Sequence, residues 1–164
     1  MKTTIRGTVA PLGTKKQRLS PPSMPYRKGK GRTIGIINLD IFHLIVAVFI
    51  SDEDRCKDME RFGFQPEPET RSFRGLAVQS YDDQGHCFHA IVITPDGDDS
   101  TITHEASHIV DFLFDHLGIP GDMGSTELRA YLSSYLIERT RQMVLKNQID
   151  YPQFYATAPE QAAS

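Results

Sequence analysis

The apolar segment around residue 40 constrains the fold of this 164-residue chain more than any other feature. Within TIGIINLDIFHLIVAVFISD, the stretch Phe42–Ile50 is too continuously apolar for one of its faces to lie in water. This pattern predicts a central strand that is covered on both sides. The longest apolar run, Ile41–Ile50, includes His43 and is shorter than a membrane span, so we expect no insertion into a bilayer.

Capping residues and glycines predict the elements that follow this strand. A short helix begins after Ser51 or Asp52 and ends before Gly63. Two β-favouring runs, GLAVQSY and CFHAIVIT, are separated by DDQGH and predict an antiparallel hairpin. Two helices complete the domain: THEASHIVDFLFDHL, closed by Gly118, and a longer helix over Glu127–Lys146. The expected fold class is α+β, with a mixed or antiparallel sheet of three to four strands packed on the last two helices.

Charge is divided unevenly along the chain. Residues 1–32 hold nine of the 18 Lys and Arg and no Asp or Glu, whereas the rest holds nine bases and 21 acids, so the two parts carry +9 and −12. This first part, the basic arm, also contains four prolines, which predicts a flexible or extended segment. Such an arm can neutralise phosphates or lie on an acidic surface, including that of its own domain. We expect the folded domain at 33–150 and a disordered tail at 151–164.

Composition and cysteine content predict where the protein works. Apolar residues make up 39% and charged residues 24%, which is typical of a soluble globular protein. The two cysteines, Cys56 and Cys87, are too few for a disulfide framework. The first residues contain no apolar run that resembles a signal peptide. We therefore expect a cytoplasmic protein in a reducing compartment.

His104, Glu105 and His108 form an HExxH motif within the predicted helix at 103–117. Histidines at positions i and i+4 leave one side of a helix, so two neutral imidazole nitrogens can reach one metal ion. Glu105 is rotated off that line and can act beside the metal as a general base. Zinc is the expected cofactor, because it lowers the pKa of a bound water toward neutrality. The alternative is a surface helix with two solvated histidines.

A catalytic zinc usually takes three protein ligands, and Glu127 is the best candidate for the third. It lies nineteen residues after His108, at the start of a helix that Ser125 or Thr126 is expected to cap. An antiparallel return of the chain would place its carboxylate against the histidine pair. Alternatively, a glutamate in the first turn interacts only with the helix dipole. Three further carboxylates remain as fallback ligands: Asp111, Asp115 and Asp122.

Two more residues are candidates for roles next to the metal. Asp111 shares a helix face with both histidines, so it could accept a hydrogen bond from a ligating imidazole and select its tautomer. It could equally be an ordinary surface aspartate. Tyr131, one turn beyond Glu127, could direct its hydroxyl toward the oxyanion of an intermediate and is a candidate catalytic residue. The alternative for Tyr131 is a core position.

HEASH followed by GSTELRAY resembles the gluzincin branch of the zincin metallopeptidases, in which HExxH lies on one helix and a glutamate on the next supplies the third ligand. In size the chain is similar to short phage-encoded zincin-like proteins and to ImmA/IrrE-type peptidases. The resemblance implies a small zincin-like domain that hydrolyses peptide bonds. Asp111 and Phe114 stand where metzincins have a glycine and a third ligand, and Tyr131 stands where thermolysin-like enzymes have an aspartate.

The resemblance also implies a site for the substrate. In peptidases of this type, an edge strand before the HExxH helix pairs with an extended substrate, by β-augmentation. CFHAIVIT is the candidate strand, with His89, Ala90 and Ile91 as the expected substrate-binding residues. For His89, a buried structural position is the competing interpretation.

Three functions compete at this point. The first is a cytoplasmic zinc endopeptidase that acts on a protein or peptide. The second is a non-catalytic zincin-like binding or regulatory module, whose basic arm contacts nucleic acid or an acidic protein partner. The third is a zinc hydrolase that acts on a non-peptide amide.

Overall fold

Two strands, rather than one, form from the apolar segment at the start of the domain. The computed structural model describes residues 33–155. Strand β1 (Gly35–Leu39) pairs antiparallel with strand β2 (Leu44–Phe49) across a 3-10 turn at Asp40–Phe42. His43 ends the turn in the left-handed region, with φ of 55°. The prediction of a single strand did not include β1. The chain reverses between β1 and β2 without a glycine or a proline, so neither of these turn residues marks the reversal in the sequence.

The middle of the chain follows the predicted order. Helix α1 (Asp52–Arg61) begins where the Ser51 hydroxyl accepts a hydrogen bond from the Asp54 amide. It ends before Gly63, whose φ of 83° suits a glycine. Strand β3 (Gly75–Tyr81) and strand β4 (Cys87–Ile93) then form the predicted antiparallel hairpin.

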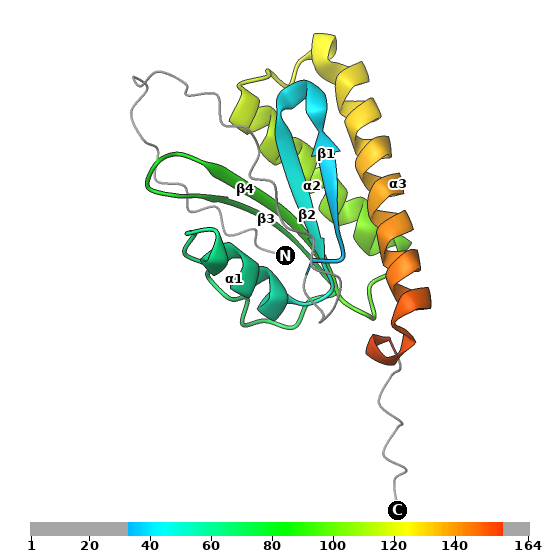
Figure 1. Ribbon diagram of the computed structural model, residues 1–164. Helices are drawn as coiled ribbons and strands as arrows, with labels where there is room; N and C mark the ends of the chain where they lie inside the picture. The colour runs from blue at the N-terminus through cyan, green and yellow to red at the C-terminus, as the bar shows by residue number, and fades with distance from the viewer. Residues whose placement is uncertain (1–32, 156–164) are drawn as a thin grey trace, which may run out of the picture.

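The four strands form one mixed sheet in the order β1-β2-β4-β3, shown in Figure 1. Strands β2 and β4 are parallel neighbours, with Val48 opposite Ile91, whereas both outer pairs are antiparallel. The predicted α+β class is confirmed. The two interior strands are β2 and β4, which agrees with the prediction of a covered strand at Phe42–Ile50.

Two long helices follow the sheet. Helix α2 (Asp99–Leu117) begins with a capping box formed by Asp98 and Thr101, and Gly118 closes it in the left-handed conformation. Helix α3 (Thr126–Asp150) extends beyond the predicted end at Lys146. Short 3-10 turns lie on either side of α3, at Met123–Ser125 before it and at Pro152–Phe154 after it.

The helices lie on opposite faces of the sheet. Residues Val46, Val48 and Ile91 pack against α2 and α3, whereas the alternating residues Ala47 and Phe49 pack against Met59 of α1. Figure 1 shows α2 and α3 side by side, with α1 separate from them. The sheet is thus the middle layer of the domain.

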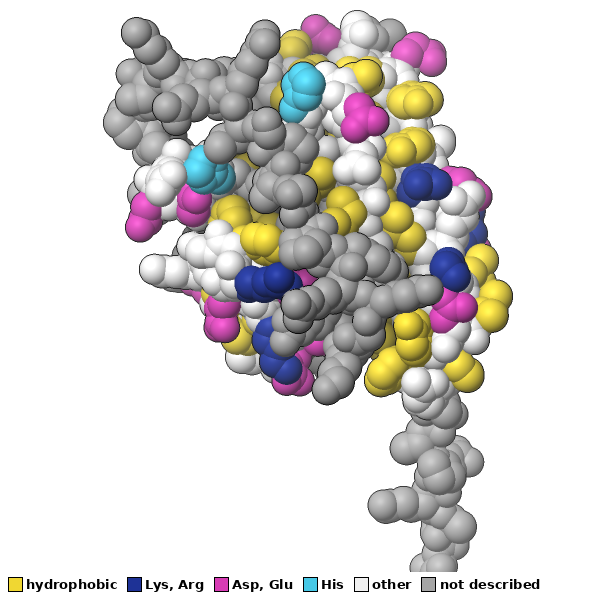
Figure 2. Space-filling view, viewed as in Figure 1, with side chains coloured by type: hydrophobic (Ala, Val, Ile, Leu, Met, Phe, Trp, Pro, Cys, Tyr) yellow, Lys and Arg dark blue, Asp and Glu magenta, His cyan; other side chains and the backbone are white. Residues whose placement is uncertain are grey.

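The surface retains several large apolar side chains on α3. Tyr131, Leu145 and Ile149 are exposed, and Figure 2 shows hydrophobic side chains along this flank of the molecule. None of the helices within residues 33–155 has both the length and the apolar character needed to cross a bilayer. The predicted basic arm and residues 156–164 of the predicted tail lie outside the described residues.

Candidate metal centre

The two histidines of the HExxH motif converge on the exposed side of α2. His104 and His108 bring their Nε2 atoms to 3.1 Å from each other, with the two ring planes at 88°. Two nitrogens that bind one tetrahedral zinc at 2.0–2.1 Å lie about 3.3 Å apart. The spacing of the imidazoles therefore fits chelation of one ion, and the helical spacing alone accounts for it.

The surroundings leave room beside these rings. A shallow depression of about 580 Å³ is lined by Asp99, Ser100, Thr103, His104 and Ser107. On the other side, the His108 ring stacks on Phe112, with centroids 6.4 Å apart and planes at 23°. The His104 side chain therefore borders a polar hollow, and the His108 ring is supported from one side.

Glu105 lies between the histidines in sequence but points toward the sheet. It is 5% exposed, and β3 lies against it. Burial raises the pKa of the Glu105 carboxyl, while the two imidazoles and a hydrogen bond from the Ala77 backbone act in the opposite direction. A carboxylate in this position is close to the histidine pair and is held by strand β3.

Gly75 makes this approach of helix and strand possible. A Cβ at Gly75 would overlap Thr101 Cγ2 and would lie 2.7 Å from Glu105 Cγ and 2.9 Å from its Oε1. Sequence reasoning missed this residue as part of the site. The available signal was a glycine at the first position of a β-favouring run, which marks a close approach of another element.

Glu127 is not brought to the histidine pair. Asp99 pairs with Arg141 and Asp111 with Arg129, so α2 and α3 are antiparallel neighbours. This register places Glu127, two residues before Arg129, level with the part of α2 just beyond Asp111. Within residues 33–155, no three His, Cys, Asp or Glu side chains are arranged to hold one ion. Ligation by Glu127, or by the fallback residues Asp111, Asp115 and Asp122, stays a prediction.

Asp111 has a partner on the next helix. Its Oδ1 accepts a hydrogen bond from Arg129 Nη1, and the Arg129 guanidinium also lies over the Phe114 ring, 4.5 Å from the centroid. The observed contact of Asp111 therefore joins α2 to α3. The predicted hydrogen bond to a ligating imidazole remains untested.

Tyr131 lies on the outside of α3. Its side chain is 62% exposed, and its ring stacks on Tyr135 at 6.2 Å with nearly parallel planes. The Tyr135 hydroxyl donates to the Asn38 carbonyl of β1, so this ring pair lies on the β1 side of the helix. The alternative of a core position for Tyr131 is wrong. Its predicted action on an oxyanion stays a prediction.

The predicted substrate strand is not at an edge. Strand β4, with His89, Ala90 and Ile91, lies between β2 and β3, and all three residues are at most 2% exposed. Its backbone groups are already paired on both sides, so pairing of a substrate with these residues, as predicted, is wrong. β3 is the edge strand that lies beside α2.

His89 is a buried structural residue, as the competing interpretation held. Gln79 Nε2 lies 3.2 Å from His89 Nε2 and 3.1 Å from the Phe112 carbonyl of α2. Because the amide donates to both, His89 Nε2 is an acceptor and the ring is neutral. Burial lowers the pKa of His89 to about 3, and the nearby His116 acts in the same direction. This hydrogen-bond chain links β3, β4 and α2.

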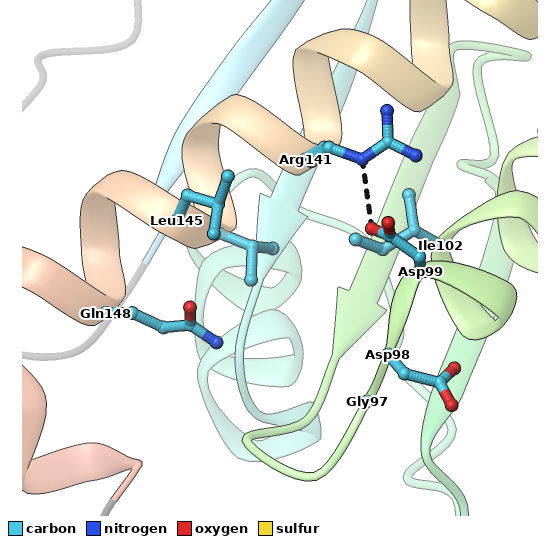
Figure 3. Close-up of a pocket in the computed structure, with 8 residues that line it drawn as sticks. Gly97, Asp98, Asp99, Ile102, Arg141, Leu145 and Gln148 are labelled. Atoms are coloured by element: carbon cyan, nitrogen blue, oxygen red, sulfur yellow. Dashed lines mark hydrogen bonds and ion pairs between the residues drawn. The ribbon is translucent and has the colours of Figure 1, made fainter.

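A second hollow lies between the start of α2 and the C-terminal half of α3 (Figure 3). Its volume is about 220 Å³, and its lining includes Ile102, Leu145 and Gln148. Arg141 Nε donates to Asp99 Oδ1 across it at 2.9 Å. Arg141 and Asp99 therefore pair with each other across this hollow, and Asp98 on its lining pairs with Arg74. The histidine pair with Glu105 remains the stronger candidate for chemistry.

Comparisons of the chain with models of protein families, with curated proteins and with solved structures find no significant match.

Proposed function

We propose that this protein is a zinc-dependent metallopeptidase that hydrolyses peptide bonds. The observation that carries the proposal is the convergence of His104 and His108 Nε2 at 3.1 Å on one helix, with the Glu105 carboxylate beside them. Two imidazoles with this spacing suit a divalent ion that prefers nitrogen ligands.

Each residue of the motif has a distinct role in this proposal. His104 and His108 would hold the ion through their Nε2 atoms. When bound, zinc lowers the pKa of a coordinated water and polarises the scissile carbonyl. Glu105 takes the proton of the attacking water on a carboxylate oxygen and passes it to the leaving amine. The contact with the Ala77 backbone keeps that carboxylate on the side of the helix that faces β3.

The exposed edge of β3 is the proposed binding site for the substrate backbone. Among the described strands it pairs only with β4, so its other edge is open to an extended peptide. Because β3 also contacts Glu105 through Gly75, a peptide on this edge would pass close to the motif. The proposal includes a reducing compartment such as the cytoplasm, because Cys56 and Cys87 are both free thiols.

Metal content tests the first half of the proposal. We expect the full chain, purified without chelator or added zinc, to contain about one zinc per molecule by elemental analysis. His104→Ala with His108→Ala should remove it, because the two chelating imidazoles are then both gone. His86→Ala is the matched control, since His86 pairs with Asp82 in the β3–β4 turn, and it should retain the metal. Equal metal content in all three proteins would contradict the site.

Peptide cleavage tests the second half. Glu105→Gln keeps the shape of the side chain and both histidines, so we expect unchanged zinc content and loss of cleavage of a peptide library by at least about 100-fold. If zinc is bound but the wild type and Glu105→Gln cleave peptides at the same rate, the cleavage does not come from this site; if neither cleaves any peptide of the library, the peptidase proposal is wrong. If the wild type and Glu105→Gln complement a cellular phenotype equally well, catalysis is not needed, and the non-catalytic binding module is favoured instead.

A further inference from the structure

The shallow depression beside His104 has a polar lining. Its volume of about 580 Å³ lies within the range of binding sites for small molecules. The described residues that line it supply one carboxylate, three hydroxyls and one imidazole, with no Lys or Arg among them: Asp99, Ser100, Thr103, His104 and Ser107. A ligand in this depression therefore meets oxygen atoms on most sides.

Two of the three hydroxyls already use their hydrogen within α2. Thr103 Oγ1 donates to the Asp99 carbonyl at 2.8 Å, and Ser107 Oγ donates to the His104 carbonyl at 2.6 Å. A hydroxyl has one hydrogen and two lone pairs, so with these bonds in place both oxygens can only accept. They offer acceptors to a ligand in the depression.

The carboxylate at the depression is only partly neutralised. Arg141 pairs with Asp99 at 2.9 Å (Figure 3) and also with Glu138 at 3.3 Å. One guanidinium between two carboxylates leaves this group with a net charge of −1. The Asp99 side chain is 70% exposed, so a ligand can reach it. An ionised carboxylate accepts several hydrogen bonds, so Asp99 can bind a further donor beside Arg141.

The start of α2 does not make this depression a site for an anion. The free amides in the first turn of a helix can attract anions, but here the Asp98 carboxylate already accepts from the Thr101 amide. An anion in the depression would also be repelled by Asp99. The lining therefore favours a group that carries positive charge and donates hydrogen bonds.

We propose that the depression beside His104 binds the ammonium or guanidinium group of a lysine or arginine in the peptide substrate. This inference rests on the proposed function and names its substrate class, which is peptides with a basic side chain close to the scissile bond. His104 is a proposed metal ligand and also lines the depression, so a side chain held there belongs to a residue near the bond that is cleaved. The several donors of lysine and arginine match a lining of acceptors.

Binding of two small probes tests the depression separately from catalysis. N-acetyl-lysine methylamide and N-acetyl-norleucine methylamide both have an unbranched side chain, but only the first carries an ammonium group. In NMR titrations of the full chain, we expect the lysine probe to shift the amide signals of Ser100, Thr103 and Ser107. The norleucine probe should leave these signals unchanged. The measurement does not require cleavage of either probe.

Two substitutions remove the proposed acceptors one at a time. Asp99→Asn removes the charge, while its amide oxygen can still accept from Arg141, and Thr103→Val removes a hydroxyl while it keeps the shape of the side chain. We expect each variant to bind the lysine probe about threefold more weakly than the wild type. Glu53→Gln is the matched control, because Glu53 is an exposed, ion-paired carboxylate at the start of α1, and it should bind the probe as the wild type does.

Equal signal shifts with the two probes would overturn the proposal, even if the protein cleaves peptides. The same conclusion follows if Asp99→Asn binds the lysine probe as tightly as the wild type.

Cleavage of a peptide library connects the depression with the substrate. We expect the wild type to prefer Lys or Arg near the cleaved bond, and Asp99→Asn to reduce this preference about threefold without a change in zinc content. Cleavage without any preference for basic residues would refute the substrate class. Binding of the lysine probe without cleavage of any peptide would support the cation site and contradict the peptidase proposal alone.

Discussion

At the scale of single residues, two polar side chains are buried between the sheet and α2, and burial shifts the pKa of each. His89 is 2% exposed and hydrogen-bonded to Gln79, and Glu105 is 5% exposed and contacts β3. Burial favours the uncharged form of each, so it lowers the pKa of the histidine and raises that of the glutamate. The pKa of His89 is thus lower than that of a solvated histidine, and the pKa of Glu105 is higher than that of a solvated glutamate.

The buried His89 predicts a loss of stability in acid. Its pKa falls from 6.5 to about 3 in the folded protein, so below pH 6.5 the unfolded chain binds a proton that the folded chain does not. The free energy of unfolding should then decrease by up to about 1.4 kcal/mol per pH unit as the pH falls from 6.5 toward 3. Urea unfolding of the wild type and His89→Gln between about pH 7 and pH 4.5 measures this difference. If the free energy of unfolding changes with pH in the same way for the two proteins, this prediction is wrong.

At the scale of elements, the packing of α2 determines which side chains can form a site. Two exposed ion pairs, Asp99 with Arg141 and Asp111 with Arg129, join α2 to α3 in antiparallel register. This register makes His104 and His108 level with about residues 136 and 132 of α3, whereas Glu127 lies in its first turn. On its other side, α2 approaches β3 so closely that only a glycine fits at position 75.

Gly75→Ala should therefore destabilise the contact between α2 and β3. The new methyl group would meet Thr101 and Glu105 below 3 Å, so we expect a loss of about 1–3 kcal/mol in the free energy of unfolding. Gly121→Ala is the matched control, because the nearest atom to its Cβ would be Arg129 Nη2 at 3.9 Å, and it should change stability by less than about 0.5 kcal/mol. Similar urea midpoints for the two variants would show that the contact can relax.

At the scale of the whole molecule, β4 is the centre around which the layers are built. It is paired on both edges, and its two faces contribute Ile91 to the core under α2 and α3 and Ala90 to the core over α1. A strand in this position cannot receive a further strand. Association with an extended partner therefore has to use one of the outer strands, β1 or β3.

Truncation of side chains should distinguish this centre from the surface of α3. Ile91 is fully buried, so Ile91→Ala should lower the free energy of unfolding by about 2–5 kcal/mol. Ile149 is 80% exposed, and Ile149→Ala should cost less than about 0.5 kcal/mol in the isolated protein. Chemical denaturation of both variants is the measurement. A large loss for Ile149→Ala would mean that this side chain is covered by a partner in solution.

The amino-acid sequence by itself determined the local elements and the spacing within the motif. Ser51 and the glycines at 63 and 118 mark helix ends, because capping and left-handed conformations depend on nearby residues only. The convergence of His104 and His108 follows equally from a separation of four residues on one helix. These features could be predicted because each depends on short-range geometry.

Only the tertiary structure decided which distant segments meet. Strand order put β4 inside the sheet and β3 at its edge, and helix register put Asp111 beside Arg129 of α3. Gly75 gained its importance in the same way, through the close approach of Glu105. Such contacts depend on the packing of elements that are far apart in the sequence, and the pattern within any one element does not contain that information.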